Sequence, residues 1–430
     1  MTLEWLRDPN TRWVLGGCIL LGISSGVLGS FALLRRRSLT GDALAHAALP
    51  GICAAFLLSG TRSLGVLLTG ALVAGLLGAL CIQAITRQSR VKADAALGVV
   101  LSVFFAVGIV LLTLIQHTGK GSQAGLDTYI FGQAASLIGT DVRVMAVCAG
   151  LVCALTIIFF KEFKLICFDP GFATGLGFPA TVLDSLLMLL IVVVVVIGLQ
   201  AVGVVLMAAM LIIPASTARF WTDRLTLMVW LAGIIGAMSG ALGTWMSATA
   251  SRMPTGPLIV LSATAIFIVS LVFSPKRGLL AKALHLVALR SRVGQENTLR
   301  SLYELAEAAG SWDLQVTPEE LAAHRGQSPR AMASQLARLA RQGLVSTAYG
   351  RSQLTERGMK TAYAVVRNHR LWEMFLMYES QMGADHVHRD ADFVEHHLSL
   401  DTVRELERLL QVHGLEPKLP PSVHPVPSGT

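Results

Sequence analysis

Long apolar runs dominate the first two thirds of the chain, with charged residues concentrated between the runs. Each run is close to the roughly 20 residues that a helix needs to cross a bilayer. Nine candidate membrane spans follow, at residues 13–34, 44–61, 64–86, 94–116, 143–160, 180–198, 200–217, 226–248 and 256–274. The stretch 180–217 is nearly unbroken, and we divide it at Gly198–Gln200, where a tight polar turn fits. Without that turn, the count is eight.

The last third of the chain has a different pattern. From residue 295, apolar positions recur at helical spacing among charged ones, as in ENTLRSLYELAEAA, which is typical of a water-soluble helical domain. A capping box begins one helix at Thr317, and Ser328 opens the next one. Gly343 ends that helix, and the following residues predict a short β-hairpin that turns at Gly350. Helix, turn, helix and hairpin together indicate a winged DNA-binding layout.

Composition and charge give the membrane part an orientation. The chain has 430 residues, of which 53% are hydrophobic and 14% charged, and this excludes an ordinary soluble protein. Long apolar runs also disfavour a membrane β-barrel. Clusters of Lys and Arg, beginning with Arg35–Arg37, occupy alternate loops, which places those loops in the cytoplasm. With nine spans, the C-terminal third then lies in the cytosol. The six cysteines stand singly in or beside apolar runs, which indicates buried residues and no disulfide framework.

Ionisable residues at membrane depth are costly and point to function. Asp42 and His46 are four residues apart, so a helix places their carboxylate and imidazole on one side, where they can share a divalent cation. The alternative is a helix-capping Asp and a His bonded to a backbone carbonyl. Asp94 and Asp184 begin apolar runs, and capping or interfacial placement accounts for them better than metal ligation does.

Five sequence blocks carry a resemblance to a transporter family. They are RRRSLTGDALAHAALPGI, DAALGVVLS, LDTYIFGQ, FDPGFATGLG and VGVVLMAAMLIIPASTAR, in this order. Residues 11–275 thereby resemble the membrane permease of the bacterial ABC importers for manganese, zinc and iron. The resemblance implies that Asp42 and His46 lie near the translocation path and meet the metal. Asp42 stands at the cytoplasmic start of its span, which is in tension with a site at the bilayer midplane.

The same resemblance implies that residues 168–177 form the coupling helix that touches the ATPase. The residues concerned are Phe168, Asp169, Pro170, Gly171, Phe172, Ala173, Gly175 and Gly177. The chain has no GxxxxGK[ST] phosphate loop, so it is not itself the ATPase and we expect no enzyme activity. ATP hydrolysis then belongs to a separate subunit.

The C-terminal part holds a second set of potential metal ligands. His369 and Glu373 are spaced i, i+4, and VHRDADFVEHH supplies His388, Asp392, Glu395 and His396. Imidazole and carboxylate without thiolate suit manganese, iron(II) or zinc. The alternative is a solvated helix surface rich in His and acidic residues.

This part resembles the iron- and manganese-dependent repressor family. HRLWEMFL and VHRDADFVEHHLS are similar to its two ligand-bearing helices, and residues 295–360 to its winged helix. The resemblance implies that the six potential ligands fall on ligand positions. Asp392 stands where the iron-sensing members have Cys, which favours manganese over iron. Asn297 stands at an N-terminal ligand position that is Met or Asp in the family, which weakens the site or leaves it to a water.

The second helix of the winged layout carries the candidate DNA-binding residues. Its side chains suit phosphates and base edges, and they are Ser328, Arg330, Ser334, Gln335, Arg338 and Arg341. The alternative is solubility alone, which is the more frequent reason for charge on a surface helix.

We therefore predict an all-α polytopic membrane protein with about eight or nine transmembrane helices, followed by a cytosolic winged helix-turn-helix domain and a helical metal-binding and dimerisation domain. The predicted parts are a permease domain (1–275), a basic amphipathic linker (276–294), a winged domain (295–360), a metal-binding domain (361–413) and a disordered tail (414–430).

The predicted function is that of a permease subunit in an ATP-driven importer at the plasma (inner) membrane, with a cytosolic metal-responsive domain. Manganese is the favoured metal, with iron or zinc as alternatives. Expected partners are an ABC ATPase subunit, an extracytoplasmic metal-binding protein and a second permease protomer, with operator DNA as a further candidate. The alternative function is a membrane-tethered, metal-dependent transcription regulator that transports nothing, although such an anchor would not need the coupling segment.

Overall fold

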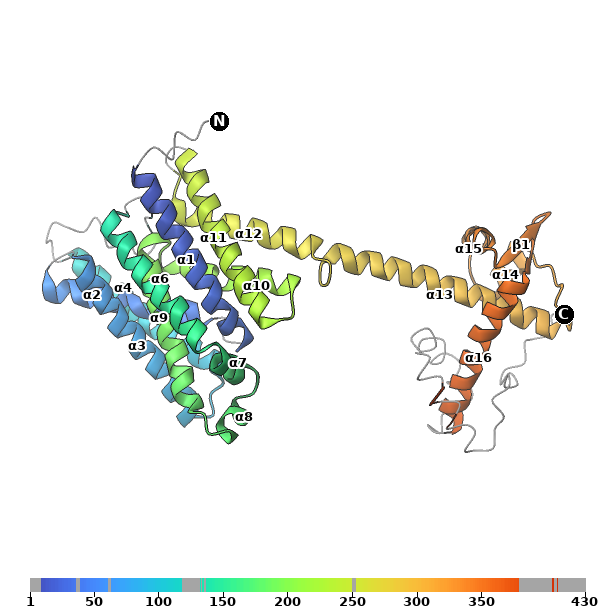
Figure 1. The fold of residues 1–430 in the computed structure, drawn as a ribbon, viewed down its shortest axis with the longest axis horizontal. Coiled ribbons are helices and arrows are strands. Elements are labelled where there is room, and N and C mark those ends of the chain that lie inside the picture. The colour runs from blue at the N-terminus through green and yellow to red at the C-terminus, as the bar shows by residue number, and fades with distance from the viewer. Residues whose placement is uncertain are drawn as a thin grey trace. The chain divides into compact units, whose positions relative to one another are not determined.

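The computed structural model describes residues 9–35, 39–60, 63–117, 132, 134, 137–249, 253–378, 404–405 and 408. The chain divides into two compact units, residues 1–282 and 283–430, and each is described by itself. Figure 1 shows that helices make up nearly all of the regular structure of both.

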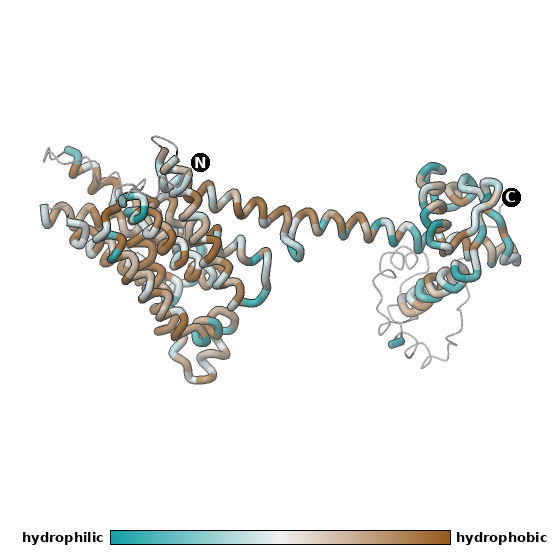
Figure 2. The backbone as a smooth tube through the Cα atoms, turned by 45° about the horizontal axis from the view of Figure 1, so that its top comes forward, coloured by the Kyte–Doolittle hydropathy of each residue, from teal (hydrophilic) through white to brown (hydrophobic). Residues whose placement is uncertain are grey.

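The first unit is a bundle of apolar helices (Figure 1). They are α1 (Pro9–Leu34), α2 (Thr40–Ser59), α3 (Leu64–Gln88), α4 (Ala93–His117), α6 (Gly139–Ile158), α7 (Phe160–Phe168), α8 (Pro170–Gly175), α9 (Ala180–Ala201), α10 (Val204–Trp221), α11 (Leu225–Thr249) and α12 (Thr255–Phe273). In the part of the chain that the structure describes, eight of these are long and apolar enough to cross a membrane, and α10 is a shorter apolar helix. The hydropathy colouring of Figure 2 shows how little of this bundle is hydrophilic. The prediction of a polytopic membrane protein is confirmed.

The break between α9 and α10 falls later than the predicted turn at 198–200. Gln200 still lies inside α9, and its Nε2 donates to Oδ2 of Asp141 at 3.0 Å, so a buried carboxylate satisfies this polar side chain. The chain turns instead at Gly203, whose φ of +89° suits glycine and few other residues. The prediction of a break between two helices is therefore right, but the chain turns a few residues later than predicted.

Close packing in this bundle depends on small residues. Helix α1 packs extensively on α11, and a Cβ atom at Gly236 would lie 2.0 Å from the carbonyl oxygen of Gly22. Backbones approach this closely only where neither residue carries a side chain, as is common between membrane helices. The abundance of glycine in the sequence thus has a direct structural cause.

The second unit contains most of α13 (Leu279–Ala308), then α14 (Pro318–Arg325), α15 (Pro329–Arg341), β1 (Val345–Ala348), β2 (Arg351–Leu354) and α16 (Glu356–Tyr378). Its core includes Leu302, Leu321, Leu336 and Val366 from four different helices. The predicted linker 276–294 and the first helix of the winged domain are one element, because α13 is continuous from Leu279 to Ala308. Hydrophilic and apolar residues alternate along this unit in Figure 2.

The local signals of the winged domain are confirmed. The Thr317 hydroxyl accepts from the backbone N–H of Glu320, while Glu320 accepts from the backbone N–H of Thr317, and this hydrogen bond lowers the pKa of the Glu320 carboxyl. Ser328 caps α15. Strands β1 and β2 pair antiparallel around a turn in which Gly350 has a φ of +77°.

Candidate metal sites and coupling segment

The structure brings Asp42 and His46 together at the start of α2. Asp42 lies in the first turn, and its Oδ1 is 3.3 Å from Nε2 of His46. The Asp42 side chain is 30% exposed and that of His46 13%, while the imidazole packs edge-on against the ring of Phe105 at 4.7 Å. Nδ1 of His46 is buried and has no hydrogen-bond partner among the described residues. The imidazole is thus not held by a backbone carbonyl, which was the alternative explanation for it.

Asp42 and His46 alone provide few ligands for a metal site. Within the described residues, His, Cys, Asp and Glu side chains do not gather in groups of three that could hold a metal ion. Two donors fall short of the four to six that a divalent cation takes up. Any further ligands would come from water, backbone oxygens, residues outside the described ranges or another molecule.

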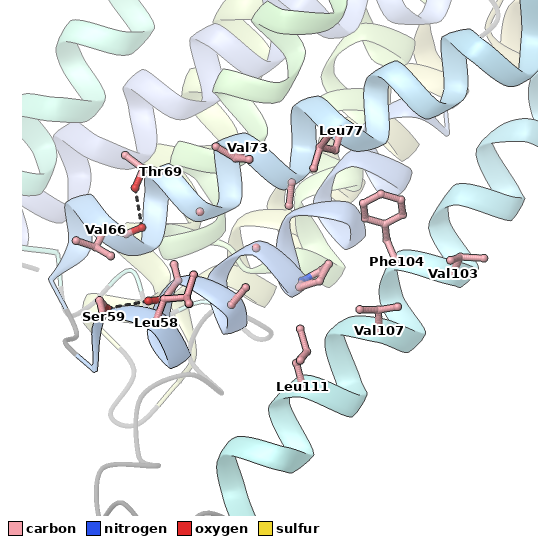
Figure 3. A pocket seen from close by; sticks show the side chains of 16 residues that line it. Leu58, Ser59, Val66, Thr69, Val73, Leu77, Val103, Phe104, Val107 and Leu111 are labelled. Carbon is pink, nitrogen blue, oxygen red and sulfur yellow. Dashed lines mark hydrogen bonds between the residues drawn. The ribbon is translucent and has the colours of Figure 1, made fainter.

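A large apolar groove lies further along α2. It has a volume of about 820 Å³ and is lined by residues of α2, α3 and α4, among them Leu58, Val73 and Leu111 (Figure 3). Neither Asp42 nor His46 lines it. Its lining carries no ionisable side chain, so the groove suits hydrocarbon and is unsuited to a hydrated cation.

The predicted coupling segment 168–177 contains the last residue of α7, the short helix α8 and the turn that follows it. Helices α7 and α8 lie together at one end of the first unit (Figure 1). Asp169 caps α8, since its Oδ1 accepts from the backbone N–H of Phe172 at 2.9 Å, and Pro170 occupies the first helical turn. Phe168 and Phe172 are 63% and 56% exposed, whereas Ala173 is buried. The segment therefore exposes two aromatic side chains, one on each side of the residue that caps α8.

The remaining glycines of the segment have different roles. Gly177 has a φ of +86° and turns the chain towards α9. Gly171 and Gly175 have no close contact that would exclude a larger side chain.

An ion pair that sequence analysis missed anchors this segment. Arg35 lies just after α1, and its Nη2 is 3.1 Å from Oδ1 of Asp184 in α9, with both side chains at most 14% exposed. Its Nη1 donates to the carbonyl oxygen of Ile166 in α7 at 3.0 Å. Asp184 is thus not a helix cap, because α9 begins at Ala180. One guanidinium ties α1, α7 and α9 together.

The His369 and Glu373 side chains of α16 are buried and bonded. Nε2 of His369 lies 3.0 Å from Oε1 of Glu373, and the two residues are 2% and 3% exposed. The alternative of a solvated helix surface is therefore wrong for this pair. Arg300 of α13 approaches the other side of the ring, with Nη1 3.0 Å from Nδ1. The other four predicted ligands, His388, Asp392, Glu395 and His396, lie outside the described residues, as does the predicted tail 414–430.

The candidate DNA-binding residues of α15 divide into two groups. Arg330, Ser334 and Arg341 are exposed, and Ser328 serves as the helix cap. Gln335 and Arg338 face α13: Gln335 accepts from the hydroxyl of Thr298 at 2.6 Å, and Arg338 donates to the hydroxyl of Ser291 at 3.1 Å. Part of the predicted recognition surface is therefore already bonded to α13, although Arg338 is itself exposed.

Comparisons with known proteins match two family profiles to different parts of the chain. The profile described as "ABC 3 transport family" matches residues 7–274, and the profile "Iron dependent repressor, metal binding and dimerisation domain" matches residues 355–427. The "Manganese transport system membrane protein MntC" of Bacillus subtilis is 48% identical over 426 residues, which cover 99% of this chain and 97% of that protein.

Two further similarities concern the membrane part. The "Zinc transport system membrane protein TroC" of Treponema pallidum is 45% identical over 65% of this chain and 93% of its own. The solved structure "PsaBC from Streptococcus pneumoniae in complex with Fab" matches with a TM-score of 0.57 and 34% identity, covering 64% of this chain and 98% of that chain.

Proposed function

Because the chain belongs to the ABC 3 transport family, we propose that this multi-pass membrane protein is the permease subunit of an ATP-driven importer of divalent metal, with manganese as the favoured cargo. The observation that carries the proposal is the Asp42–His46 pair: a carboxylate and an imidazole on one face of a membrane helix, with His46 Nδ1 without a hydrogen-bond partner among the described side chains. A manganese transport protein similar over nearly the whole chain supports the choice of metal, and a zinc transport protein keeps zinc as a second candidate.

In this proposal the metal passes Asp42 and His46 as cargo. Oxygen and nitrogen donors suit manganese. Two of them lie here among the described residues, so the ion would keep water ligands or gain donors from elsewhere, such as a second permease protomer. Incomplete coordination suits a transport site, because an ion that must leave again cannot be held too tightly. An extracytoplasmic metal-binding protein would deliver the ion.

Energy would enter through α7 and α8. We propose that Phe168, at the end of α7, and Phe172, on the capped helix α8, dock in a separate ATPase subunit, since exposed aromatic side chains form a good protein contact. Arg35 bonds the carbonyl of Ile166 and the carboxylate of Asp184, so a movement of α7 would be transmitted to α1 and α9. The alternation of positive loops supports a cytosolic position for this segment and for the second unit.

The second unit would act as the metal-responsive part. Its match to a repressor metal-binding and dimerisation profile supports a sensing role for His369, Glu373, His388, Asp392, Glu395 and His396. Operator DNA remains a candidate partner through the exposed Arg330, Ser334 and Arg341. The alternative, a membrane-tethered regulator without transport, is disfavoured because the anchored coupling segment would have no use in it.

Uptake of radioactive manganese tests the proposal, in cells that lack their own manganese importers and express the chain with its ATPase and binding protein. Asp42→Ala with His46→Ala should reduce uptake at least tenfold, at an unchanged level of the protein in the membrane. The matched control is Asp94→Ala with His117→Ala, which removes an exposed Asp and an exposed His from α4 and should leave uptake intact. Undiminished uptake by the Asp42/His46 variant would contradict the proposed path.

A further inference from the structure

A buried arginine faces the candidate sensor site. Arg300 of α13 is 8% exposed, and its Nη1 lies 3.0 Å from Nδ1 of His369. Nε2 of the same ring lies 3.0 Å from Oε1 of Glu373. Arg300 also lies within 3.5 Å of the Glu304 carboxylate, one turn further along α13. The guanidinium, the imidazole and the carboxylate thus form a row between α13 and α16.

The order of donors in this row fixes the state of the ring. A guanidinium has hydrogen-bond donors and no acceptor, so Nδ1 of His369 must accept from Arg300. A neutral imidazole carries one proton, which then sits on Nε2 and is donated to Glu373. Metal ligation requires a ring nitrogen with a free lone pair. In this arrangement Nδ1 already uses its lone pair and Nε2 bears the proton.

Charge leads to the same conclusion. A divalent ion bound to His369 and Glu373 would lie within a few ångströms of the Arg300 guanidinium, in a buried setting where water screens like charges poorly. Asn297, one turn before Arg300 on α13, offers a buried amide oxygen that has no partner among the described residues, but this oxygen is neutral and does not offset the repulsion. As arranged, these residues do not fit a metal ion.

We infer that Arg300 is a built-in cation that takes the place of a metal ion at His369 and Glu373, so that metal binds these two residues only when the guanidinium leaves. This inference rests on the proposed sensing role of the second unit. Sensing would then need a threshold concentration of metal, because the metal ion must compete with the Arg300 guanidinium, which is a permanent part of the chain. A second clasp beside it, from Arg370 to both oxygens of Glu307, also joins α16 to α13.

The consequence reaches beyond the site. Arg300 belongs to α13, which begins at Leu279, soon after the last candidate membrane span ends at Phe273. Release of Arg300 would remove one of the polar contacts between α13 and α16, which also pack together in the core of the second unit. Metal binding in the second unit would therefore loosen the contact of α16 with the helix that follows the membrane part.

Binding of manganese to the full-length chain in detergent micelles tests the inference. The parent for all variants carries Asp42→Ala and His46→Ala, which removes the proposed cargo site, so the result does not depend on transport. Titration calorimetry with Mn²⁺ alone should show at least tenfold tighter binding after Arg300→Met. Arg300→Lys, which keeps the charge, should stay near the parent. The matched control is Arg292→Met, which removes an exposed ion pair on the same helix and should change nothing.

The gain must also depend on the ring. Adding His369→Ala to Arg300→Met should abolish it, which locates the new affinity at this site. Unchanged or weaker manganese binding by a folded Arg300→Met chain overturns the inference. If that variant does not fold, Arg300→Gln offers the same comparison, and nitrogen-15 shifts of the His369 ring in the parent give a direct reading. A proton on Nε2 supports the inference, and a proton on Nδ1 refutes it.

Discussion

The Arg35–Asp184 ion pair gives the most demanding prediction for the membrane part. Arg35→Met removes the guanidinium from a carboxylate whose side chain is 10% exposed and from the carbonyl oxygen of Ile166. The aliphatic part of the side chain is kept, so packing changes little. What is lost is the charge and the hydrogen bonds.

The size of the effect follows from burial. Removing one partner of a buried pair leaves an uncompensated charge, at a cost of about 3–5 kcal/mol. Replacing both partners with apolar residues of similar volume is often neutral or stabilising. Arg35→Met should therefore lower the free energy of unfolding by about 3–5 kcal/mol, and Arg35→Met with Asp184→Leu should recover most of the loss.

Denaturant unfolding of the full-length chain in mixed micelles measures both variants against the parent. A second reading is the number of manganese ions taken up per ATP hydrolysed, which should fall for the single variant because α7 loses its attachment to α1. The double variant should regain stability without regaining this ratio. Two results would contradict this reasoning: an Arg35→Met variant as stable as the parent, or a double variant as unstable as the single one. Either would show that the Arg35–Asp184 ion pair does not stabilise the fold by neutralising a buried charge.

Three smaller predictions address the packing, the caps and the recognition helix. Gly236→Ala should destabilise the membrane part severely, because the added Cβ would lie 2.0 Å from the carbonyl oxygen of Gly22. Gly150→Ala adds a Cβ that has nothing within 4 Å and should be tolerated. Thermal unfolding of the two variants compares their stabilities. Thr317→Ala should cost about 1 kcal/mol by loss of the cap, read as faster amide hydrogen exchange in α14. The pKa of the Glu320 carboxyl, which completes this cap, is lower in the folded than in the unfolded protein. Its contribution to stability is therefore fully present above the pKa of the unfolded state, and it is lost as the pH falls through the pKa of the folded state. If the second unit binds DNA, Arg330→Ala should reduce the salt slope of binding by about 1, and Arg338→Ala by less because its guanidinium already bonds α13; equal slopes in fluorescence anisotropy would contradict this.

Much of the fold could be predicted because its signals are local. A run of about 20 apolar residues permits little except a membrane helix, and a capping box or a glycine turn is decided by the residues that form it. The α9–α10 break shows where this stops. Gln200 looked like a turn residue, yet it remains helical because Asp141, nearly 60 residues earlier, receives its amide. No local pattern contains that partner.

The sites show the same division. The Asp42–His46 pair could be found from spacing alone, since one helix carries both residues. The contacts of Arg35 with Asp184 and of Arg300 with His369 join residues far apart in the sequence. In the sequence, Arg35 belongs to a basic loop cluster and Arg300 to an amphipathic helix, and both positions have sufficient explanations there. Only the arrangement of helices in space shows that each guanidinium is buried against a specific partner.

The two candidate metal sites differ in ways that suit different tasks. Asp42 and His46 are partly exposed, and the buried Nδ1 of His46 has no hydrogen-bond partner among the described residues, so none of their side chains competes with a metal ion for that nitrogen. His369 and Glu373 are almost fully buried, and a guanidinium already occupies the ring nitrogen on one side. A transport site needs rapid exchange, and a sensor needs a threshold above which it responds. A cargo site without a built-in competitor and a sensor site with one would let a single chain import metal until the internal concentration displaces Arg300.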